Sequence, residues 1–335
     1  MCCRLFVDVC CIGTNVLCVG LWCGISSDLF VQWRAGKQKR EICFLSVLSG
    51  AYFGAVSDFL LAHGKRRDDS LSLDRDKIMN IFDTHAHYDN PAFDADREEI
   101  LCNLSANGIG NVVNVGANIQ TTKNTLELIE KYPFFYGSVG IHPSETGELN
   151  DRVMKWLREM AARERVVAIG EIGLDYHWEE PDKAVQKHWF VRQLSLAREV
   201  DLPVIIHSRD AAKDTLDIIK GERVKELGGV IHCFSYGREL AREYLNMGFY
   251  LGIGGVVTFE SAKKLKEVVD YMPLDRIVLE TDCPYLSPAP HRGKRNSSLN
   301  LTYVVDEISQ LKGIGVDEVI AVTSQNARDL YRLSN

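Results

Sequence analysis

Five histidines and two carboxylates in this sequence each follow a short apolar run. They are His85, His87, His142, Glu171, His207, His232 and Asp282. A lone histidine in such a place is more often a hydrogen-bonded core or loop residue. Imidazole nitrogens mixed with carboxylate oxygens are typical ligands of Zn²⁺, Mn²⁺ or Fe²⁺, and a carboxylate-rich position can also take Mg²⁺. The repeated pattern therefore predicts a metal site.

His85 and His87 are two residues apart, so on a strand they share a face and can bind one ion. The predicted ligands of the whole site are His85, His87, Glu171, His207, His232 and Asp282. One ion is expected on His85 and His87, and a second on His207 and His232. Glu171 is expected to bridge the ions, and Asp282 to complete the set. This predicts two divalent cations per chain (Mg²⁺, Mn²⁺ or Zn²⁺).

Such a pair of ions predicts hydrolysis, because two nearby metals lower the pKa of a water and stabilise both attacking and leaving oxygens. Asp282 and Glu171 are the candidate catalytic residues, and Asp282 would orient the water and accept its proton. His142 is expected to contact the substrate or its leaving group. For Asp83 a partner that orients a histidine and a buried structural role are equally compatible with the sequence.

The elements that must position these residues alternate along the chain from residue 79. Short apolar runs predict strands at 81–82, 112–115, 136–141, 166–169, 204–206, 230–231, 250–253 and 277–279. Amphipathic segments predict helices at 95–107, 126–131, 153–163, 183–199, 211–220, 239–247, 262–271 and 301–311. Near-continuous apolar strands indicate a parallel sheet that is buried on both faces.

Eight strand–helix units in about 250 residues predict a (β/α)₈ TIM-type barrel, whose active site lies at the C-terminal ends of the strands. The candidate ligands follow the predicted strands, so this fold would gather them on one rim. A doubly wound open sheet is the alternative. It usually has fewer strands, and no GxGxxG turn follows the first strand here.

The composition, with 46% hydrophobic and 25% charged residues, is typical of a globular enzyme. The chain has 39 Lys and Arg against 46 Asp and Glu. Residues 1–78 contain ten of the basic and eight of the acidic residues, so the rest of the chain has a formal charge of about −9. This balance argues against non-specific coating of nucleic acid. Seven of the ten cysteines lie in the first 43 residues, and the three scattered ones that remain indicate the reducing cytoplasm.

Residues 1–78 differ from the rest of the chain. The stretches 10–27 and 42–57 carry no charge, yet Gly, Ser, Thr or Asn dilute both. We predict that residues 1–78 are an extension and that residues 79–335 form the hydrolase barrel. One hypothesis is a misassigned start, with the natural protein beginning at Met79. The other is a membrane-anchoring extension.

Several motifs resemble the signatures of the TatD-related family of metal-dependent hydrolases. They are Asp83-Thr-His-Ala-His87, Gly140-Ile-His-Pro143, Gly170-Glu-Ile-Gly-Leu-Asp-Tyr176, Pro203-Val-Ile-Ile-His-Ser-Arg209, His232-Cys-Phe-Ser235 and Glu280-Thr-Asp-Cys-Pro-Tyr-Leu-Ser-Pro288. The resemblance covers residues 79 to about 333 and implies a TIM-type barrel that cleaves DNA phosphodiester bonds, often as a 3′→5′ exonuclease. The family's ligands fall on the same six residues predicted above. One departure is Ser297-Ser298, where the family commonly has Glu-Pro.

Side chains that could bind a DNA substrate lie near the predicted rim. The candidates are His142, Arg209, His291, Arg292, Lys294 and Arg295. The last four form a basic loop after the eighth strand, which would suit a phosphate backbone, with a solvated basic loop as the alternative. Arg209 could clamp a phosphate or pair with Asp210. Tyr176, Trp178 and Phe234 could stack on bases or serve only in packing.

The sequence thus favours a metal-dependent DNase, cytoplasmic and monomeric, with DNA as its substrate and no stable membrane partner for the barrel. An alternative keeps the same site but hydrolyses carboxylic esters or amides, such as an aminoacyl ester, because fold alone does not choose between these chemistries. A non-enzymatic binding protein is the third hypothesis. The six intact ligand positions argue against it.

Overall fold

A computed structural model of the chain describes residues 6–9, 18–21, 28–32, 42–46 and 80–333. The chain divides into two units, Met1–Arg75 and Asp76–Asn335. Strands β1 (Phe6–Val9), β2 (Cys18–Leu21), β3 (Asp28–Gln32) and β4 (Ile42–Ser46) of the first unit pair antiparallel in chain order.

The two hypotheses on residues 1–78 remain predictions. Much of the charge-free stretches 10–27 and 42–57, and Met79 itself, lie outside the described residues. Within the described ranges, no helix is both long enough and apolar enough to cross a membrane.

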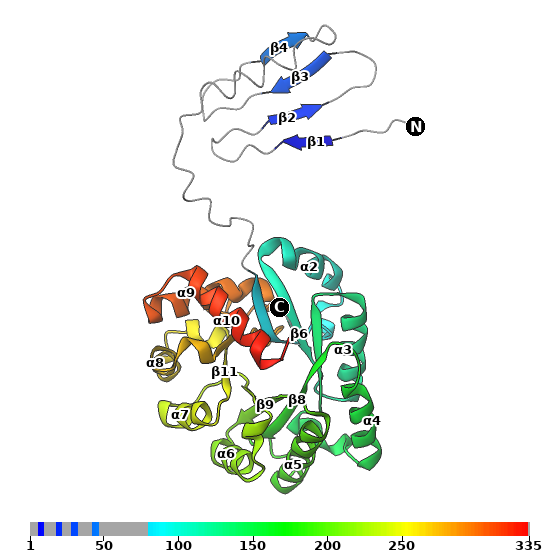
Figure 1. The fold of residues 1–335 in the computed structure, drawn as a ribbon, viewed down its shortest axis with the longest axis vertical. Coiled ribbons are helices and arrows are strands. Elements are labelled where there is room, and N and C mark those ends of the chain that lie inside the picture. The colour runs from blue at the N-terminus through cyan, green and yellow to red at the C-terminus, as the bar shows by residue number, and fades with distance from the viewer. Residues whose placement is uncertain (1–5, 10–17, 22–27, 33–41, 47–79, 334–335) are drawn as a thin grey trace. The chain divides into compact units, whose positions relative to one another are not determined.

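The second unit contains one sheet of eight parallel strands (Figure 1). They are β5 (Ile81–Ala86), β6 (Ile109–Val115), β7 (Phe135–Val139), β8 (Val166–Asp175), β9 (Val204–Arg209), β10 (Gly229–Ile231), β11 (Tyr250–Ile253) and β12 (Ile277–Leu279). Each strand pairs with its neighbours in the chain, so their spatial order is their sequence order. This arrangement confirms the predicted (β/α)₈ barrel.

The barrel closes where its first strand meets its last. Ala86 and Cys283 form a parallel bridge. The Asp282 amide donates to the His85 carbonyl at 2.9 Å, and the His87 amide donates to the Cys283 carbonyl at 2.8 Å. We call this line of contacts the β5–β12 seam. It carries metal-site residues on both of its sides.

Helices cover the outside of the barrel in chain order (Figure 1). They are α2 (Arg97–Leu104), α3 (Ile119–Lys131), α4 (Asp151–Ala161), α5 (Lys183–Val200), α6 (Ala212–Gly221), α7 (Arg238–Asn246), α8 (Lys263–Tyr271) and α9 (Leu301–Lys312). A further helix, α10 (Val316–Leu330), follows them in the chain. Helix α3 begins seven residues earlier than predicted, because Asn118 and Thr121 form a capping box before a polar first turn.

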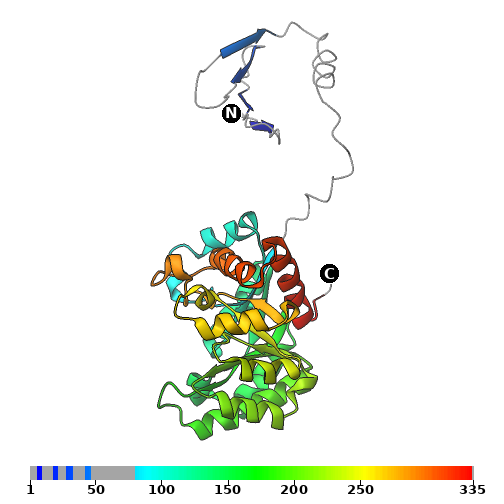
Figure 2. The ribbon, with the colours of Figure 1, turned by 90° about the vertical axis from the view of Figure 1, so that its left-hand side faces the viewer.

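Helix α10 is an element that the sequence patterns did not predict. Its Ser324 hydroxyl donates to the Asn80 carbonyl at 2.8 Å, and its Asn326 amide donates to the Ile277 carbonyl at 2.7 Å. Both carbonyls lie at the start of barrel strands, so α10 covers the end of the barrel opposite the predicted metal site (Figure 2).

The strands are apolar on both faces because they separate two cores. One buried cluster fills the barrel, with side chains from six strands and from α10: Phe82, Val113, Val115, Val167, Ala168, Ile205, Val230, Val278, Ala327, Leu330 and Tyr331. The larger cluster packs the outer faces of the strands against the helices. Apolar side chains therefore fix the strand positions, and the polar residues that follow them reach the rim.

Candidate metal centre

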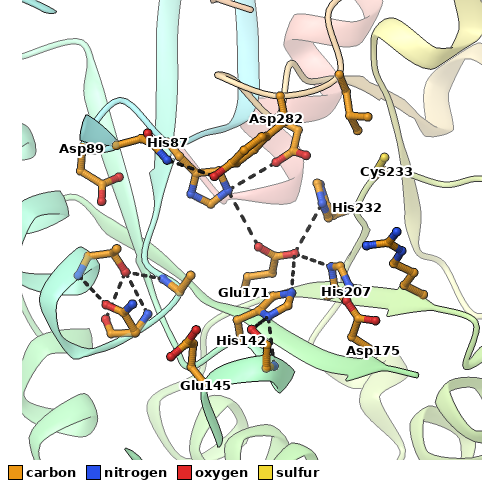
Figure 3. Close-up of a pocket in the computed structure, with 18 of the residues that line it drawn as sticks. His87, Asp89, His142, Glu145, Glu171, Asp175, His207, His232, Cys233 and Asp282 are labelled. Atoms are coloured by element: carbon orange, nitrogen blue, oxygen red, sulfur yellow. Dashed lines mark hydrogen bonds and ion pairs between the residues drawn. The ribbon is translucent and has the colours of Figure 1, made fainter. Parts of the chain in front are cut away.

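The predicted ligands converge at the end of the barrel where the strands finish (Figure 3). They come from five strands: β5, β8 and β9 carry His85, Glu171 and His207, and His232 and Asp282 follow β10 and β12. A cavity of about 940 Å³ opens over them and is lined by five of the six predicted ligands. The sixth, His85, lies behind it and is 1% exposed.

Glu171 is the centre of the site, and its two oxygens face different histidines. Oε2 lies 3.5 Å from Nε2 of His85 and 4.0 Å from Nε2 of His87. Oε1 lies 2.7 Å from Nδ1 of His207 and 3.5 Å from Nε2 of His232. One carboxylate therefore contacts both predicted ligand groups.

The first group joins His85, His87 and Asp282. The Nε2 atoms of the two histidines are 3.2 Å apart, and Asp282 Oδ1 lies 3.4 Å from Nε2 of His87. The other ring nitrogen of His87 is 3.0 Å from the Val115 carbonyl. That contact fixes the ring so that Nε2 faces the site.

The second group joins Glu171, His207 and His232. His207 turns Nδ1 to Glu171 and Nε2 to Asp175, whose Oδ2 lies 3.2 Å away. A carboxylate behind a ligand histidine fixes its tautomer and strengthens it as a metal ligand. The sequence motif 170–176 includes Asp175 but indicates no role for it, and the structure places it behind His207.

Glu280 is a buried carboxylate that the sequence reasoning did not include in the site. Its Oε1 lies 3.3 Å from Nδ1 of His232 and accepts a hydrogen bond from the Cys233 amide at 2.5 Å. Oε2 has no partner among the described residues. A Cβ on Gly252 would lie only 2.2 Å from it, so this glycine makes room for the carboxylate. The signal for Glu280 was its place directly after the eighth apolar run.

The site combines these groups with strong mutual electrostatic effects. Burial opposes the charged form of His87, but Asp282 and then Glu171 outweigh it and raise its pKa to about 9. Burial likewise opposes the charge on His232, but Glu280 and Glu171 raise its pKa to about 10. The pKa of Glu171 is held well below its usual range, because its histidine neighbours overcome the effect of burial.

This donor set fits divalent metal ions. Each of the two groups offers three ligand atoms within 4.8 Å of one another. Buried carboxylates facing several imidazoles gain most when a cation lies between them, because every donor then points at positive charge. The residues therefore suit a metal centre by their chemistry as well as by their position.

Four residues of the rim and cavity wall have left-handed backbone conformations: Cys233 with φ 46°, Asp210 and Leu286 with φ 54°, and Asp282 with φ 56°. Such angles are uncommon outside glycine and often occur at functional sites. Burial also raises the pKa of the Cys233 and Cys283 thiols. This opposes any role for either cysteine as a thiolate nucleophile.

Asp83 has a structural place in the seam. It accepts hydrogen bonds from the Thr281 hydroxyl at 2.7 Å and the Ser298 hydroxyl at 2.6 Å, and burial raises its pKa to about 7. It contacts the His85 amide and no histidine ring. Ser298, one of the two residues at which this chain departs from the family motif, is therefore a buried partner of Asp83. Its amide also donates to the Tyr88 hydroxyl at 2.9 Å.

Two predicted substrate-binding residues, His142 and Arg209, line the cavity. His142 Nε2 lies 3.9 Å from Glu171 Oε1. Arg209 is exposed, and among the described residues its guanidinium has no ion pair. Asp210, which the sequence offered as its partner, lies instead 3.6 Å from His177 Nδ1.

The four residues of the basic loop, His291, Arg292, Lys294 and Arg295, are not among those that line the cavity, and their role in substrate binding stays a prediction. Arg295 pairs with Asp96 through both carboxylate oxygens, at 2.8 and 2.5 Å. Arg292 lies over the Phe259 ring, 4.4 Å from its centroid. Local interactions thus engage Arg292 and Arg295 outside the cavity.

Of the three aromatic residues considered for base stacking, only Trp178 lines the cavity. Phe234 is buried at 2% exposure. The Tyr176 hydroxyl donates to Asp214 at 2.7 Å, and Lys183 lies over its ring. Packing therefore accounts for Tyr176 and Phe234, and Tyr285 is an additional aromatic residue of the cavity.

A (β/α)₈ barrel with this histidine–carboxylate cluster at the ends of its strands defines the metal-dependent hydrolase class. The sequence profile described as TatD related DNase matches residues 82–332. The chain belongs to this TatD-related family.

Named relatives agree with that assignment. The uncharacterized metal-dependent hydrolase YabD of Bacillus subtilis (strain 168) is 44% identical over 254 residues, which cover 76% of this chain and 100% of the relative. The 3′-5′ ssDNA/RNA exonuclease TatD of Cronobacter sakazakii is 34% identical over 256 residues, covering 75% and 97%. The crystal structure of YjjV, a TatD homologue from Escherichia coli K12, has 30% identity and a TM-score of 0.73, covering 77% and 100%.

Proposed function

We propose that this chain is a two-metal phosphodiesterase that removes nucleotides from the 3′ end of DNA. The observation that carries the proposal is the position of Glu171, which offers one carboxylate oxygen to each of two ligand groups. The Cronobacter sakazakii relative, named an exonuclease that acts on single-stranded DNA and RNA, supports this substrate class.

In this proposal His85, His87 and Asp282 would hold one ion, and two further histidines, His207 and His232, would hold the other. Glu171 would offer an oxygen to each. When bound, divalent metals supply positive charge that polarises the phosphodiester and lowers the pKa of water. The carboxylates and imidazoles of the chain fix where that charge lies.

Asp282 is the proposed residue that orients the attacking water and accepts its proton. Its side chain lines the cavity and is 18% exposed, so water can reach it. The carboxylate of Glu171 is 5% exposed and held by histidines, which suits a bridging ligand better than a group that moves protons. We therefore assign the general-base role to Asp282 and the bridging role to Glu171.

His142 is proposed to contact the phosphate or the leaving oxygen as a neutral donor. Burial and the nearby His207 lower its pKa to about 4, so it is uncharged at neutral pH. The Ser144 amide donates to Nδ1 at 3.1 Å, which leaves the proton on Nε2. Nε2 lies on the Glu171 side of the ring, so this donor is directed into the site.

Arg209 is proposed to bind a phosphate oxygen of the substrate. Arg209 lines the cavity and has no ion pair among the described residues, and an arginine can bind phosphate through two hydrogen bonds. A neutral ester or amide would offer this cation no anionic partner. This contrast favours a phosphodiester over a carboxylic ester or amide.

The test is degradation of single-stranded DNA by the full chain. With Mg²⁺ or Mn²⁺, a 5′-labelled oligonucleotide should shorten in single-nucleotide steps, and a 3′-labelled one should release its label at once. Asp282→Asn should lower kcat roughly 100-fold or more, as expected for loss of a general base. Asp306→Asn, an exposed position on α9, is the matched control.

The opposite result is equally clear. If a folded, metal-loaded protein cleaves neither oligonucleotide with Mg²⁺, Mn²⁺ or Zn²⁺, the phosphodiesterase proposal fails. Hydrolysis of aminoacyl esters or small amides by the same preparation would then assign the site to that chemistry.

A further inference from the structure

Two exposed aromatic side chains, Trp178 and Tyr285, lie at the cavity of the metal centre. They are 57% and 54% exposed, and both line the cavity together with Leu286. Large apolar side chains left in water usually mark a surface that binds something. These two are also the most exposed large hydrophobic side chains among the residues that the structure describes.

The other exposed tyrosines of the described region already have partners. Tyr271 lies under Arg238, whose guanidinium is 4.6 Å from the ring centroid. The Tyr303 hydroxyl is 3.1 Å from His291 Nε2. The His291 ring also packs against the Tyr303 ring, with centroids 5.2 Å apart. Tyr285 is engaged through its hydroxyl, which accepts a hydrogen bond from Asn90 Nδ2 at 3.1 Å. That bond orients the ring and leaves its faces accessible.

The topology places the two rings on opposite walls. Trp178 follows β8 and Tyr285 follows β12, and these strands are four positions apart in a closed barrel of eight. Glu171 on β8 and Asp282 after β12 lie between them, on either side of His85 on β5. A substrate whose phosphate reaches the metal residues therefore extends towards one aromatic ring on each side.

The charges of the cavity favour stacking over contacts along a phosphate backbone. Within the described part of the chain, Arg209 is the only Lys or Arg that lines it. Much of the remaining wall is uncharged and polar, with Asn90, Asn118, Gln120, Thr121, Asn124, Ser144, Ser208 and Ser235. A duplex bound through its backbone needs several cations. An unpaired strand can instead bind through its bases, since every base has a face that stacks on an aromatic ring.

We propose that Trp178 and Tyr285 form a two-sided stacking site for single-stranded DNA, with one nucleobase on each side of the phosphate that is cleaved. This inference rests on the proposed phosphodiesterase function and adds the two residues that would hold the bases of the strand. A stacked base on each side would also hold the phosphate still beside Arg209.

The experiment compares two substrates in the full, metal-loaded chain: an ordinary single-stranded oligonucleotide and one whose last two nucleotides are abasic. Trp178→Ala and Tyr285→Ala should each raise KM for the ordinary strand roughly tenfold, as expected for loss of one stacked base. Trp178→Phe and Tyr285→Phe should stay within about threefold of wild type, because they keep a ring. Tyr271→Ala, an exposed aromatic outside the cavity, is the matched control.

The abasic strand separates stacking from a structural role. On the abasic strand, wild type and both alanine variants should have the same KM, because no base is left to stack on either ring. An unchanged KM for the ordinary strand, or equal losses on both strands, would overturn the stacking site.

Failure of the phosphodiesterase function gives a different result, which is no cleavage of either strand by wild type. Binding of the same two strands is then measured by fluorescence anisotropy. Tighter binding of the ordinary strand that disappears in the alanine variants would retain the stacking site. Equal binding of both strands would reject it.

Discussion

Metal binding by this chain should release protons. In the metal-free site the pKa values of His87 and His232 are raised to about 9 and about 10, so both imidazoles are protonated at pH 7. A histidine binds a metal only through a neutral nitrogen. The ions must therefore displace at least these two protons.

The size of the effect follows from the same values. Removing both protons at pH 7 costs about 7 kcal/mol, at 1.36 kcal/mol for each pH unit below the pKa. Since two protons leave, the combined affinity for the ions should rise about 100-fold per pH unit near neutrality. The stability of the metal-free fold changes with pH in the opposite direction: it falls as the pH rises. Its charged histidines stabilise it fully below their ordinary pKa of 6.5, and this contribution is lost as the pH rises through 9 and 10.

The assay is isothermal titration calorimetry of the chelator-treated full chain in buffers of different ionisation enthalpy at pH 7. The dependence of the observed enthalpy on the buffer should give at least two protons released when the site is filled. His87→Ala should release about one proton fewer. His188→Gln, an exposed position on α5 outside the site, should leave the number unchanged.

The reasoning is wrong if fewer than one proton is released, or if metal affinity is the same at pH 6 and pH 8. Either result would mean that the carboxylates around His87 and His232 do not hold them in the charged form.

Three substitutions test other parts of the site. Glu280→Gln should weaken metal binding by roughly 10- to 100-fold, as is typical when a partner behind a ligand histidine is lost. Competition with a chelator measures this affinity, and an unchanged value would contradict the role of Glu280. Gly252→Ala should cost about 1–3 kcal/mol in urea unfolding, because its Cβ would meet the buried carboxylate; equal stability to Gly221→Ala, where a Cβ meets open space, would contradict the packing argument. Arg209→Ala should raise KM for single-stranded DNA roughly tenfold or more, whereas Lys294→Ala, outside the cavity, should change it less than twofold; similar effects of both would restore the basic loop as a binding surface.

The sequence predicted the barrel because its strands are set by local apolar runs. Each predicted run lies within or overlaps an observed strand, and the polar residue that follows it reaches the rim whatever the loop does next. For this reason the ligand candidates could be placed together before any distance was known. The position of Glu280 behind His232 could not, because it depends on the space left by Gly252 on the neighbouring strand.

The basic loop and α10 show the limits of local patterns. Arg295 is paired with Asp96, a residue 199 positions away, and no spacing within the loop indicates that partner. Helix α10 packs its apolar face on the start of β5 and β12, so its place is set by the two ends of the barrel sequence. Contacts between distant segments decide both cases.

The β5–β12 seam joins segments almost 200 residues apart, as the bond from the Thr84 hydroxyl to the Leu279 carbonyl illustrates. The pairing that closes the barrel therefore joins the residues of the sheet that lie farthest apart in the chain. Forming it costs more chain entropy than any other strand pairing in the sheet. The predicted ligands His85, His87 and Asp282 lie on this same line, so an ion bound there would join the first strand to the last. Metal removal should then loosen the two ends of the barrel sequence before its middle, and amide hydrogen exchange at β5 and β12 would report that order of opening.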